Sequence, residues 1–199
     1  INDVSCNFLC KFALFADDLK MYSVIKDESD MKLLQHDLDC LTKWCAKNLM
    51  VLNLDKCQAI NFSRKIKPNK PCYLIDNKIL KINTVIKDLG VFLDSKLTFK
   101  FHCDFVIAKA NKLLGCIKRF TRNFTDVRTL TILFITFVRS VLEYGCLIWA
   151  PYYRTHVERI EKIQHKFIRS MLHRLPTNVS SSMELSRSYL GLDLLESRR

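Results

Sequence analysis

The chain has 199 residues, a hydrophobic fraction of 49% and a formal net charge of +12. With only 4 glycines and 4 prolines, the composition excludes a low-complexity or disordered chain, and the apolar fraction is sufficient for a buried core. The net charge is +4 over residues 1–100 and +8 over residues 101–199, which indicates a polyanionic partner for the second half. The apolar stretches are far shorter than the ~20 residues that span a bilayer, so no membrane partner is expected.

The first predicted elements are two strands, Phe8–Phe15 and Leu19–Ile25, which flank a turn at Ala16-Asp17-Asp18. Aspartate is common in hairpin turns, so an ordinary turn is one explanation of the acidic pair. The other explanation is a metal site, because adjacent carboxylates repel each other and Mg²⁺ prefers hard oxygen ligands. These two strands alone leave both explanations open.

An amphipathic helix is predicted next, with Asp27 or Ser29 as its N-cap and an end near Asn48. Its apolar face repeats at steps of three and four residues: Met31, Leu34, Leu38, Leu41 and Cys45. The segments expected after it are a strand Cys57–Phe62, a basic loop Lys65–Pro71, and short strands Tyr73–Ile75, Ile79–Ile82 and Lys87–Leu93, with a turn at Asp76-Asn77.

After Thr98 the pattern becomes helical. One helix presents an apolar face of Val106, Ala110, Leu113, Ile117 and Phe120. Thr125 is the expected cap of a second helix that runs to about Tyr144 and is apolar almost all round, as is typical of a buried central helix. A third helix, His156–His173, is expected to turn Ile160, Ile163, Phe167 and Met171 inward, and the tail 188–199 is expected to form one more short helix.

The third helix also carries cationic side chains at steps of three and four, beside its apolar face. One explanation is a solvated face, in which the apolar stems of the cationic side chains lie along the surface and their charges stay in water. Pairing of Glu158 and Glu161 with Lys162, Lys166 or His165 would slightly weaken the positive field. The other is sequence-independent contact with the phosphates of a nucleic-acid duplex. The residues expected to bind nucleic acid, with a shorter row on the helix Val106–Phe120 included, are Lys109, Lys112, Arg119, Arg159, Lys162, Lys166 and Arg169.

Nine cysteines are spread along the chain at irregular intervals, and none belongs to a Cys-x-x-Cys pair. This pattern argues against a zinc site and against a thioredoxin-like motif. Cysteines within apolar segments are typical of small buried side chains in a reducing compartment, so an intracellular location is expected.

These elements, in this order, resemble the reverse transcriptases of non-LTR, LINE-type retrotransposons of the jockey-like kind. FADDLKMY (Phe15–Tyr22) is similar to the aromatic-x-Asp-Asp motif of that family, and Leu38–Ser63 is similar to the helix, turn and strand that follow it. DLGVFLDSKLTF (Asp88–Phe99) resembles the Leu-Gly-Val-x-Leu-Asp segment, where a hairpin grips the primer end. YGCLIWAP (Tyr144–Pro151) and the helix after it resemble the thumb, and Ile1–Asp3 resembles the end of the motif just upstream.

The resemblance implies an α+β fold, in which the last part of a polymerase palm precedes an all-helical thumb. The implied divisions are 1–98 for the palm part with its primer-grip-like hairpin, 99–175 for the thumb, and 176–199 for a short tail with a helix. The implied function is that of a fragment of an RNA-directed DNA polymerase. Its partners would be an RNA template, a DNA primer, deoxynucleoside triphosphates and the rest of the polyprotein upstream, in the cytoplasm and nucleus.

The resemblance also implies which residues carry the chemistry. Paired aspartates suit two-metal phosphoryl transfer, in which two ions about 3.5–4 Å apart stabilise the attacking and leaving oxygens. By the resemblance, Asp17 and Asp18 are the catalytic ligands of Mg²⁺ or Mn²⁺, with Asp17 as the metal ligand and Asp18 as the second acid. Adjacent strand positions point to opposite faces, so the two carboxylates need not both reach one pair of ions. In this family a lysine near the place of Lys56 approaches the triphosphate and protonates the leaving group; a solvated turn lysine is the alternative.

The chain departs from the family pattern at one point. No segment matches the earlier strand on which a polymerase palm carries a further metal-binding aspartate, so we expect these 199 residues alone to be inactive. Two other hypotheses stay open at this stage. One is a decayed or repurposed remnant that only binds nucleic acid through its basic helices, and the other is a helical protein–protein module.

Overall fold

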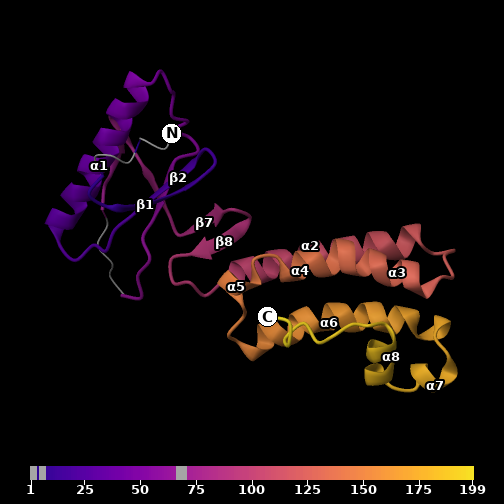
Figure 1. The fold of residues 1–199 in the computed structure, drawn as a ribbon. Helices are drawn as coiled ribbons and strands as arrows, with labels where there is room; N and C mark the ends of the chain where they lie inside the picture. Colours follow the sequence, from indigo (N-terminus) through magenta and orange to yellow (C-terminus); the bar gives the residue numbers. More distant parts are fainter. Residues whose placement is uncertain (1–3, 5–7, 66–70) are drawn as a thin grey trace. The chain divides into compact units, whose positions relative to one another are not determined.

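A computed structural model of the chain describes residue 4, residues 8–65 and residues 71–199. The chain divides into two compact units, Ile1–Ile86 and Lys87–Arg199, which are described separately (Figure 1). The first unit combines one long helix with short strands, and the second is mainly helical, which confirms the α+β class. The units divide ahead of residue 98, and the assignment of 1–98, 99–175 and 176–199 to palm, thumb and tail stays a prediction. Ile1–Asp3 and most of the basic loop 65–71 lie outside the described residues.

The first unit begins with the predicted hairpin, in which β1 (Lys11–Phe15) pairs antiparallel with β2 (Asp18–Tyr22). Its turn residues are Ala16 and Asp17, and Asp18 already belongs to β2. Both strands are shorter than predicted. β1 starts late because the backbone N–H groups of Leu9 and Cys10 donate to the side chain of Asp37 instead of to a neighbouring strand.

The predicted amphipathic helix is confirmed as α1 (Glu28–Lys47). Asp27 is the N-cap, and Asp30 completes a capping box by accepting the Asp27 backbone N–H. Leu41 and Cys45 pack beneath the hairpin, whereas Leu38 packs on the strands that follow. The helix therefore joins the two small cores of this unit.

The other strands of the first unit form two two-stranded sheets. β4 (Leu74–Ile75) and β5 (Lys78–Ile79) pair around the predicted Asp76-Asn77 turn, and β3 (Gln58–Ile60) pairs parallel with β6 (Lys81–Asn83). The prediction of one strand over Ile79–Ile82 is wrong, because two separate strands occupy this segment. The backbone N–H of Leu80 donates to the carbonyl of Tyr73 at 2.8 Å and so separates β5 from β6.

A second hairpin, β7 (Val85–Asp88) and β8 (Val91–Asp94), replaces the single strand expected over Lys87–Leu93. The turn residues Leu89 and Gly90 have φ angles of 42° and 88°. Two successive left-handed residues make the turn that matches the twist of a hairpin, so the glycine marks a reversal inside an apolar run. The hairpin that the family resemblance implies at this segment is therefore present.

The second unit is built around α2 (Lys100–Phe120), the middle helical segment of residues 127–143, and α6 (Arg154–Met171). Phe134 of the middle segment stacks on Phe167 of α6 with ring centroids 4.3 Å apart, and both side chains are fully buried. The inward positions predicted for the third helix, Ile160, Ile163, Phe167 and Met171, are all buried. The helical elements are α2 (Lys100–Phe120), α3 (Val127–Leu133), the π-helical turn η2 (Phe134–Arg139), α4 (Ser140–Glu143), α5 (Cys146–Trp149), α6 (Arg154–Met171), the 3₁₀ turn η3 (Leu172–Arg174), α7 (Thr177–Ser180) and α8 (Met183–Tyr189).

Three expectations about these helices are wrong. Phe120 is 82% exposed, because the buried row of α2 advances by fours through Leu114 and leaves Phe120 on the outer side. Asp126, not Thr125, caps the middle segment by accepting two backbone N–H groups. That segment is not buried all round, since Ile132 and Phe137 are each more than half exposed.

The tail also differs from the expected helix over 188–199. Its helix, α8, ends at Tyr189, and the chain continues without a helix to Arg199. Leu192 and Leu195 are buried in the core of the second unit, so the tail is part of that core. No helix in the described part of the chain is both long and apolar enough to cross a membrane.

Candidate catalytic hairpin and nucleic-acid interface

Asp17 and Asp18 lie together at the exposed tip of the β1–β2 hairpin. Asp17 is the second turn residue, and Asp18 opens β2 opposite Phe15. Exposed carboxylates are the hard oxygen donors that Mg²⁺ and Mn²⁺ prefer, so the donor chemistry of the tip fits such an ion. Among the described residues, no group of three or more Asp, Glu, His or Cys side chains is arranged to hold a metal ion. The tip therefore presents two exposed carboxylates, and a role for them in a two-metal site stays a prediction.

The body of the hairpin fixes this tip on α1. Leu14 and Leu19 are paired across the strands and, with Met21, pack on the cluster that contains Leu41 and Cys45 of α1. At the turn, Ala16 takes a left-handed φ of 55°, which costs a non-glycine residue roughly 1–2 kcal/mol. The packing of the strands overrides this local preference and holds the tight turn on which Asp17 lies.

Asp37 of α1 is the residue of this region that sequence reasoning missed. It is fully buried, and its carboxylate accepts the backbone N–H groups of Leu9 and Cys10, just ahead of β1. The donors lie 28 and 27 residues earlier in the chain, so no local pattern could have indicated the contact. The sequence itself shows only an acidic residue next to Leu38 of the apolar face.

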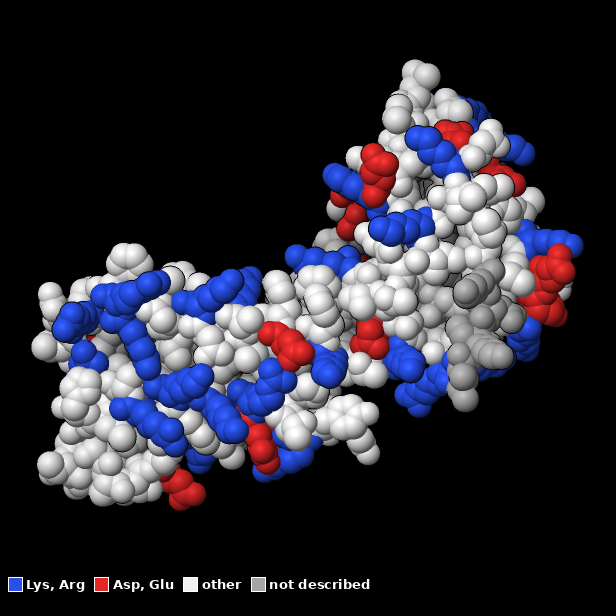
Figure 2. Space-filling model, turned by 180° about the vertical axis from the view of Figure 1, so that it is seen from behind, with Lys and Arg blue, Asp and Glu red and all other residues white. Residues whose placement is uncertain are grey.

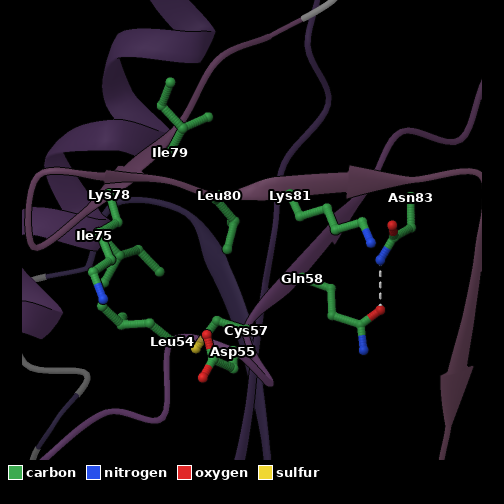
Figure 3. A pocket seen from close by; sticks show the side chains of 10 residues that line it. All are labelled: Leu54, Asp55, Cys57, Gln58, Ile75, Lys78, Ile79, Leu80, Lys81 and Asn83. Carbon is green, nitrogen blue, oxygen red and sulfur yellow. Dashed lines mark hydrogen bonds between the residues drawn. The ribbon is translucent and has the colours of Figure 1, made fainter.

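Lys56 belongs to the first unit and lies in the turn that precedes β3. Its backbone N–H donates to the carbonyl of Asn53 at 3.0 Å, which defines the turn, and its side chain is exposed. A pocket of about 360 Å³ opens beside this turn, with Asp55 and Lys78 among its charged lining residues (Figure 3). Lys56 does not line it. The catalytic role of Lys56 and the solvated-turn alternative are therefore both still predictions.

The β7–β8 hairpin is anchored on the helices of the second unit. The Tyr144 hydroxyl donates to the carbonyl of Leu89 at 2.8 Å, and a Cβ added at Gly90 would stand 3.1 Å from the Tyr144 ring. His102 of α2 accepts the backbone N–H of Phe92 at 3.2 Å. Burial lowers the pKa of His102, so its neutral form is the one that accepts this bond.

Asp94 is the last residue of β8 and organises the turn that leads to α2. Its carboxylate accepts the backbone N–H groups of Lys96, Thr98 and Phe99, at 2.7 Å for Phe99, and the hydroxyl of Thr98. Burial raises the pKa of Asp94, but these bonds to the charged form outweigh it, and the net pKa lies below the ordinary value. Asp94 is thus a structural acid that joins strand to helix.

The seven cationic residues predicted to bind nucleic acid are all exposed and all lie on α2 and α6. Figure 2 shows Lys and Arg side chains gathered over this helical unit, at the left of the view. Three contacts tie the two helices together: Arg159 pairs with Asp104 at 2.7 Å, the Lys166 ammonium donates to Asn111 at 3.0 Å, and the Lys118 ammonium donates to the Lys166 carbonyl at 3.2 Å. The two rows therefore lie on adjoining helices, and we call the seven residues together the basic face.

The two glutamates of α6 beside this face have other partners than its lysines. Glu158 pairs with Arg154 at 3.3 Å, and the buried Glu161 accepts the backbone N–H of Glu196 at 2.9 Å. Within the described residues, neither glutamate pairs with Lys162 or Lys166. Lys118, which sequence reasoning missed, adds a further cation, and burial together with the charge of Lys166 lowers its pKa.

Comparison with known proteins supports the family that the motifs indicated. The chain is 28% identical over 169 residues to the RNA-directed DNA polymerase from mobile element jockey of Drosophila funebris, a match that covers 80% of this chain and 18% of that protein. It is 26% identical over 175 residues to the probable RNA-directed DNA polymerase from transposon X-element of Drosophila melanogaster, covering 84% and 19%. It is 23% identical over 193 residues to a Pol polyprotein from type-1 retrotransposable element R1 of Bradysia coprophila, covering 93% and 19%.

The extent of these matches limits what they establish. The chain spans about a fifth of the length of the curated relatives it matches. No family model matches the chain, and no solved structure matches it. The resemblance found in the motifs is confirmed: over most of its length the chain is similar to the RNA-directed DNA polymerases of the jockey and X-element retrotransposons and to the Pol polyprotein of the R1 element.

Proposed function

We propose that the chain is part of an RNA-directed DNA polymerase, with the catalytic hairpin of the palm in its first unit and a thumb in its second. The observation that carries this proposal is the position of Asp17 at the exposed tip of a two-residue hairpin, in a chain similar to such polymerases. The reaction is addition of a deoxynucleotide to a DNA 3′ end on an RNA template.

The carboxylates of Asp17 and Asp18 would hold Mg²⁺ or Mn²⁺. When bound, such an ion lowers the pKa of the primer hydroxyl and stabilises charge on the leaving pyrophosphate. The hairpin contributes position, because a short turn closed by paired strands holds a carboxylate more tightly than a loop does. Lys56, exposed in the same unit, would donate a proton to the leaving pyrophosphate.

The basic face of α2 and α6 would bind the template–primer duplex. Its cations project from two adjoining helices, and most have no carboxylate partner among the described residues. Contacts of this kind reach phosphates, which carry no base identity, so binding is expected to be independent of sequence and sensitive to salt. Lys118 is added to this surface because it lies between the two helices.

The 199 residues by themselves are proposed to lack polymerase activity. A two-metal centre needs more carboxylates than the pair at the hairpin, and the described residues provide no third acid beside them. A segment that supplies the further aspartate would complete the centre. Under this proposal, the isolated chain binds metal weakly and nucleic acid well.

Metal binding at the hairpin can be tested on the isolated chain. Millimolar Mn²⁺, added to ¹⁵N-labelled protein, should broaden the amide signals of residues near the tip, from Phe15 to Leu19. Asp17→Asn should remove this broadening while leaving the remaining spectrum unchanged. Asp55→Asn, a change at an exposed turn of the same unit, is the matched control and should leave the broadening intact. Broadening that is absent in the wild type, or equal in Asp17→Asn, would contradict the proposal.

A further inference from the structure

The base of the catalytic hairpin is held by a buried carboxylate. Asp37 has no exposed surface, and its Oδ2 atom accepts the backbone N–H of Leu9 at 2.8 Å and of Cys10 at 2.6 Å. These are the two residues directly before β1. A charge-assisted hydrogen bond is about twice as strong as a neutral one, so two such bonds fix the entry of the strand on α1.

The side chains around Asp37 support its charged form. Burial, and after it the adjacent Asp37, raise the pKa of the Cys10 thiol to about 12, so the thiol stays protonated beside the carboxylate. Burial raises the pKa of Asp37 itself, but the bonds from Cys10 and Leu9 outweigh burial and the net pKa is lowered. His36 contributes a ring nitrogen 3.3 Å from Oδ1. The carboxylate is therefore ionised and supplied with donors.

A buried charge is an unexpected way to hold this hairpin if stability is its only purpose. Removal of a carboxylate from water is costly, and a well-packed apolar residue often gives equal or greater stability. Apolar contact has no preferred direction, however, and the hairpin already has such contacts through Leu14, Leu19 and Met21. Hydrogen bonds to two successive N–H groups add direction, since they fix how β1 leaves the helix.

The orientation of β1 at its base determines where the tip of the hairpin lies. A five-residue strand spans about 17 Å, so a tilt of about 5° at its base displaces the tip by about 1.5 Å. Catalytic groups must stay within about 0.5 Å of their working geometry. A small change at Asp37 is thus sufficient to move Asp17 out of place.

We propose that Asp37 is a positioning residue for the metal-binding hairpin, which holds the base of β1 on α1 and thereby sets the location of the Asp17 carboxylate. This inference rests on the proposed function of Asp17. Asp37 would touch neither metal nor substrate, and its effect would reach them through the backbone of β1.

The test compares Asp37→Asn with Asp39→Asn in the 199-residue chain. Asp39 lies on the same helix but is exposed, where it accepts a bond from the Gln35 side chain at 2.8 Å. In Asp37→Asn, broadening at the tip should require at least about 10-fold more Mn²⁺, which is the loss typical when a group that orients a metal ligand is removed. In Asp39→Asn, the Mn²⁺ requirement should be unchanged. Circular dichroism and the amide spectrum confirm that each variant is folded.

A second readout does not depend on metal. Residual dipolar couplings of the amides in residues 11–22, measured against those of α1, report the orientation of the hairpin. They should change in Asp37→Asn and stay constant in Asp39→Asn. Unchanged couplings in a folded Asp37→Asn would overturn the inference. Absence of Asp17-dependent broadening in the wild type would instead overturn the proposed function, and the couplings would still decide the role of Asp37.

If Asp37→Asn does not fold, Cys10→Ala provides the test. It removes the thiol beside the carboxylate but keeps the carboxylate and both backbone bonds. The couplings should shift in the same direction by a smaller amount, with a smaller rise in the Mn²⁺ requirement. Wild-type couplings and wild-type Mn²⁺ dependence in Cys10→Ala would then overturn the inference.

Discussion

Removal of the unpaired cations of α6 should weaken the salt dependence of nucleic-acid binding by a calculable amount. The variant replaces Lys162, Lys166 and Arg169 by glutamine, which keeps a polar side chain and a good helix propensity. None of the three pairs with a carboxylate among the described residues, so each is available to a phosphate. One phosphate contact contributes about 0.7–0.9 to the slope of log Kobs against log salt, so the slope should fall in magnitude by about 2–3.

Arg159 should behave differently from these three residues. Its guanidinium lies 2.7 Å from the carboxylate of Asp104, which already neutralises part of its charge. A duplex must compete with this ion pair, so Arg159→Gln should change the slope by less than one unit. Among the described residues, the row of α6 thus divides into Arg159, which has a carboxylate partner, and three cations that have none.

The assay is fluorescence anisotropy of a labelled RNA–DNA hybrid, titrated at several salt concentrations between about 50 and 200 mM. Arg154→Gln is the matched control, since Arg154 lies on the same helix and pairs with Glu158 at 3.3 Å and with Glu196 at 3.2 Å. Its slope should equal that of the wild type. A folded triple variant whose slope also equals the wild type would refute the proposed interface on α6.

Three further predictions concern the second unit. Phe134→Ala should lower the free energy of unfolding by about 3–5 kcal/mol in urea titrations, because it leaves a cavity against the stacked ring of Phe167; a loss below about 1 kcal/mol would contradict the core described here. Gly90→Ala should lower the free energy of unfolding by about 1–3 kcal/mol, since the φ of 88° is left-handed and the Tyr144 ring lies close. Tyr144→Phe should lower it by about 0.5–1.5 kcal/mol through the loss of one hydrogen bond, and a larger loss in Tyr144→Phe than in Gly90→Ala would show that the turn is misplaced. Asp94 has a lowered pKa in the folded chain, so its contribution to stability is fully present above the ordinary carboxyl pKa and is lost as the pH falls through the folded value. In thermal melts below about pH 4, the wild type should therefore lose more stability than Asp94→Asn, and equal losses in the two proteins would contradict this role.

Local signals made much of the fold predictable from sequence. The capping acid Asp27, the paired strands around Asp17 and the inward face of α6 each depend on residues close together in the chain. A cap, a turn and a helical repeat are set by neighbours, and so a single sequence reveals them. The Leu89-Gly90 turn had such a signal in its glycine, but a continuous apolar run concealed it.

Features that depend on distant partners could not be predicted. Asp37 has an ordinary position on an amphipathic helix, and its role arises from N–H groups near the start of the chain. The contact of Lys118 is equally distant in sequence, since its ammonium group bonds to a carbonyl of α6, 48 residues later. The leucines of the tail were expected to lie in a helix. Leu192 and Leu195 instead belong to a segment without regular structure, and both are buried because they pack into the core of the second unit.

Primer extension on an RNA template tests the central claim most directly. The protein is a chimera, in which residues 1–199 replace the segment that they match in the jockey polymerase of Drosophila funebris, so that upstream segments are supplied. With Mg²⁺ and deoxynucleoside triphosphates, the chimera should extend the primer, and Asp17→Asn should reduce extension to background while hybrid binding persists. Extension that survives Asp17→Asn, or a folded chimera that binds the hybrid and extends nothing, would contradict the account.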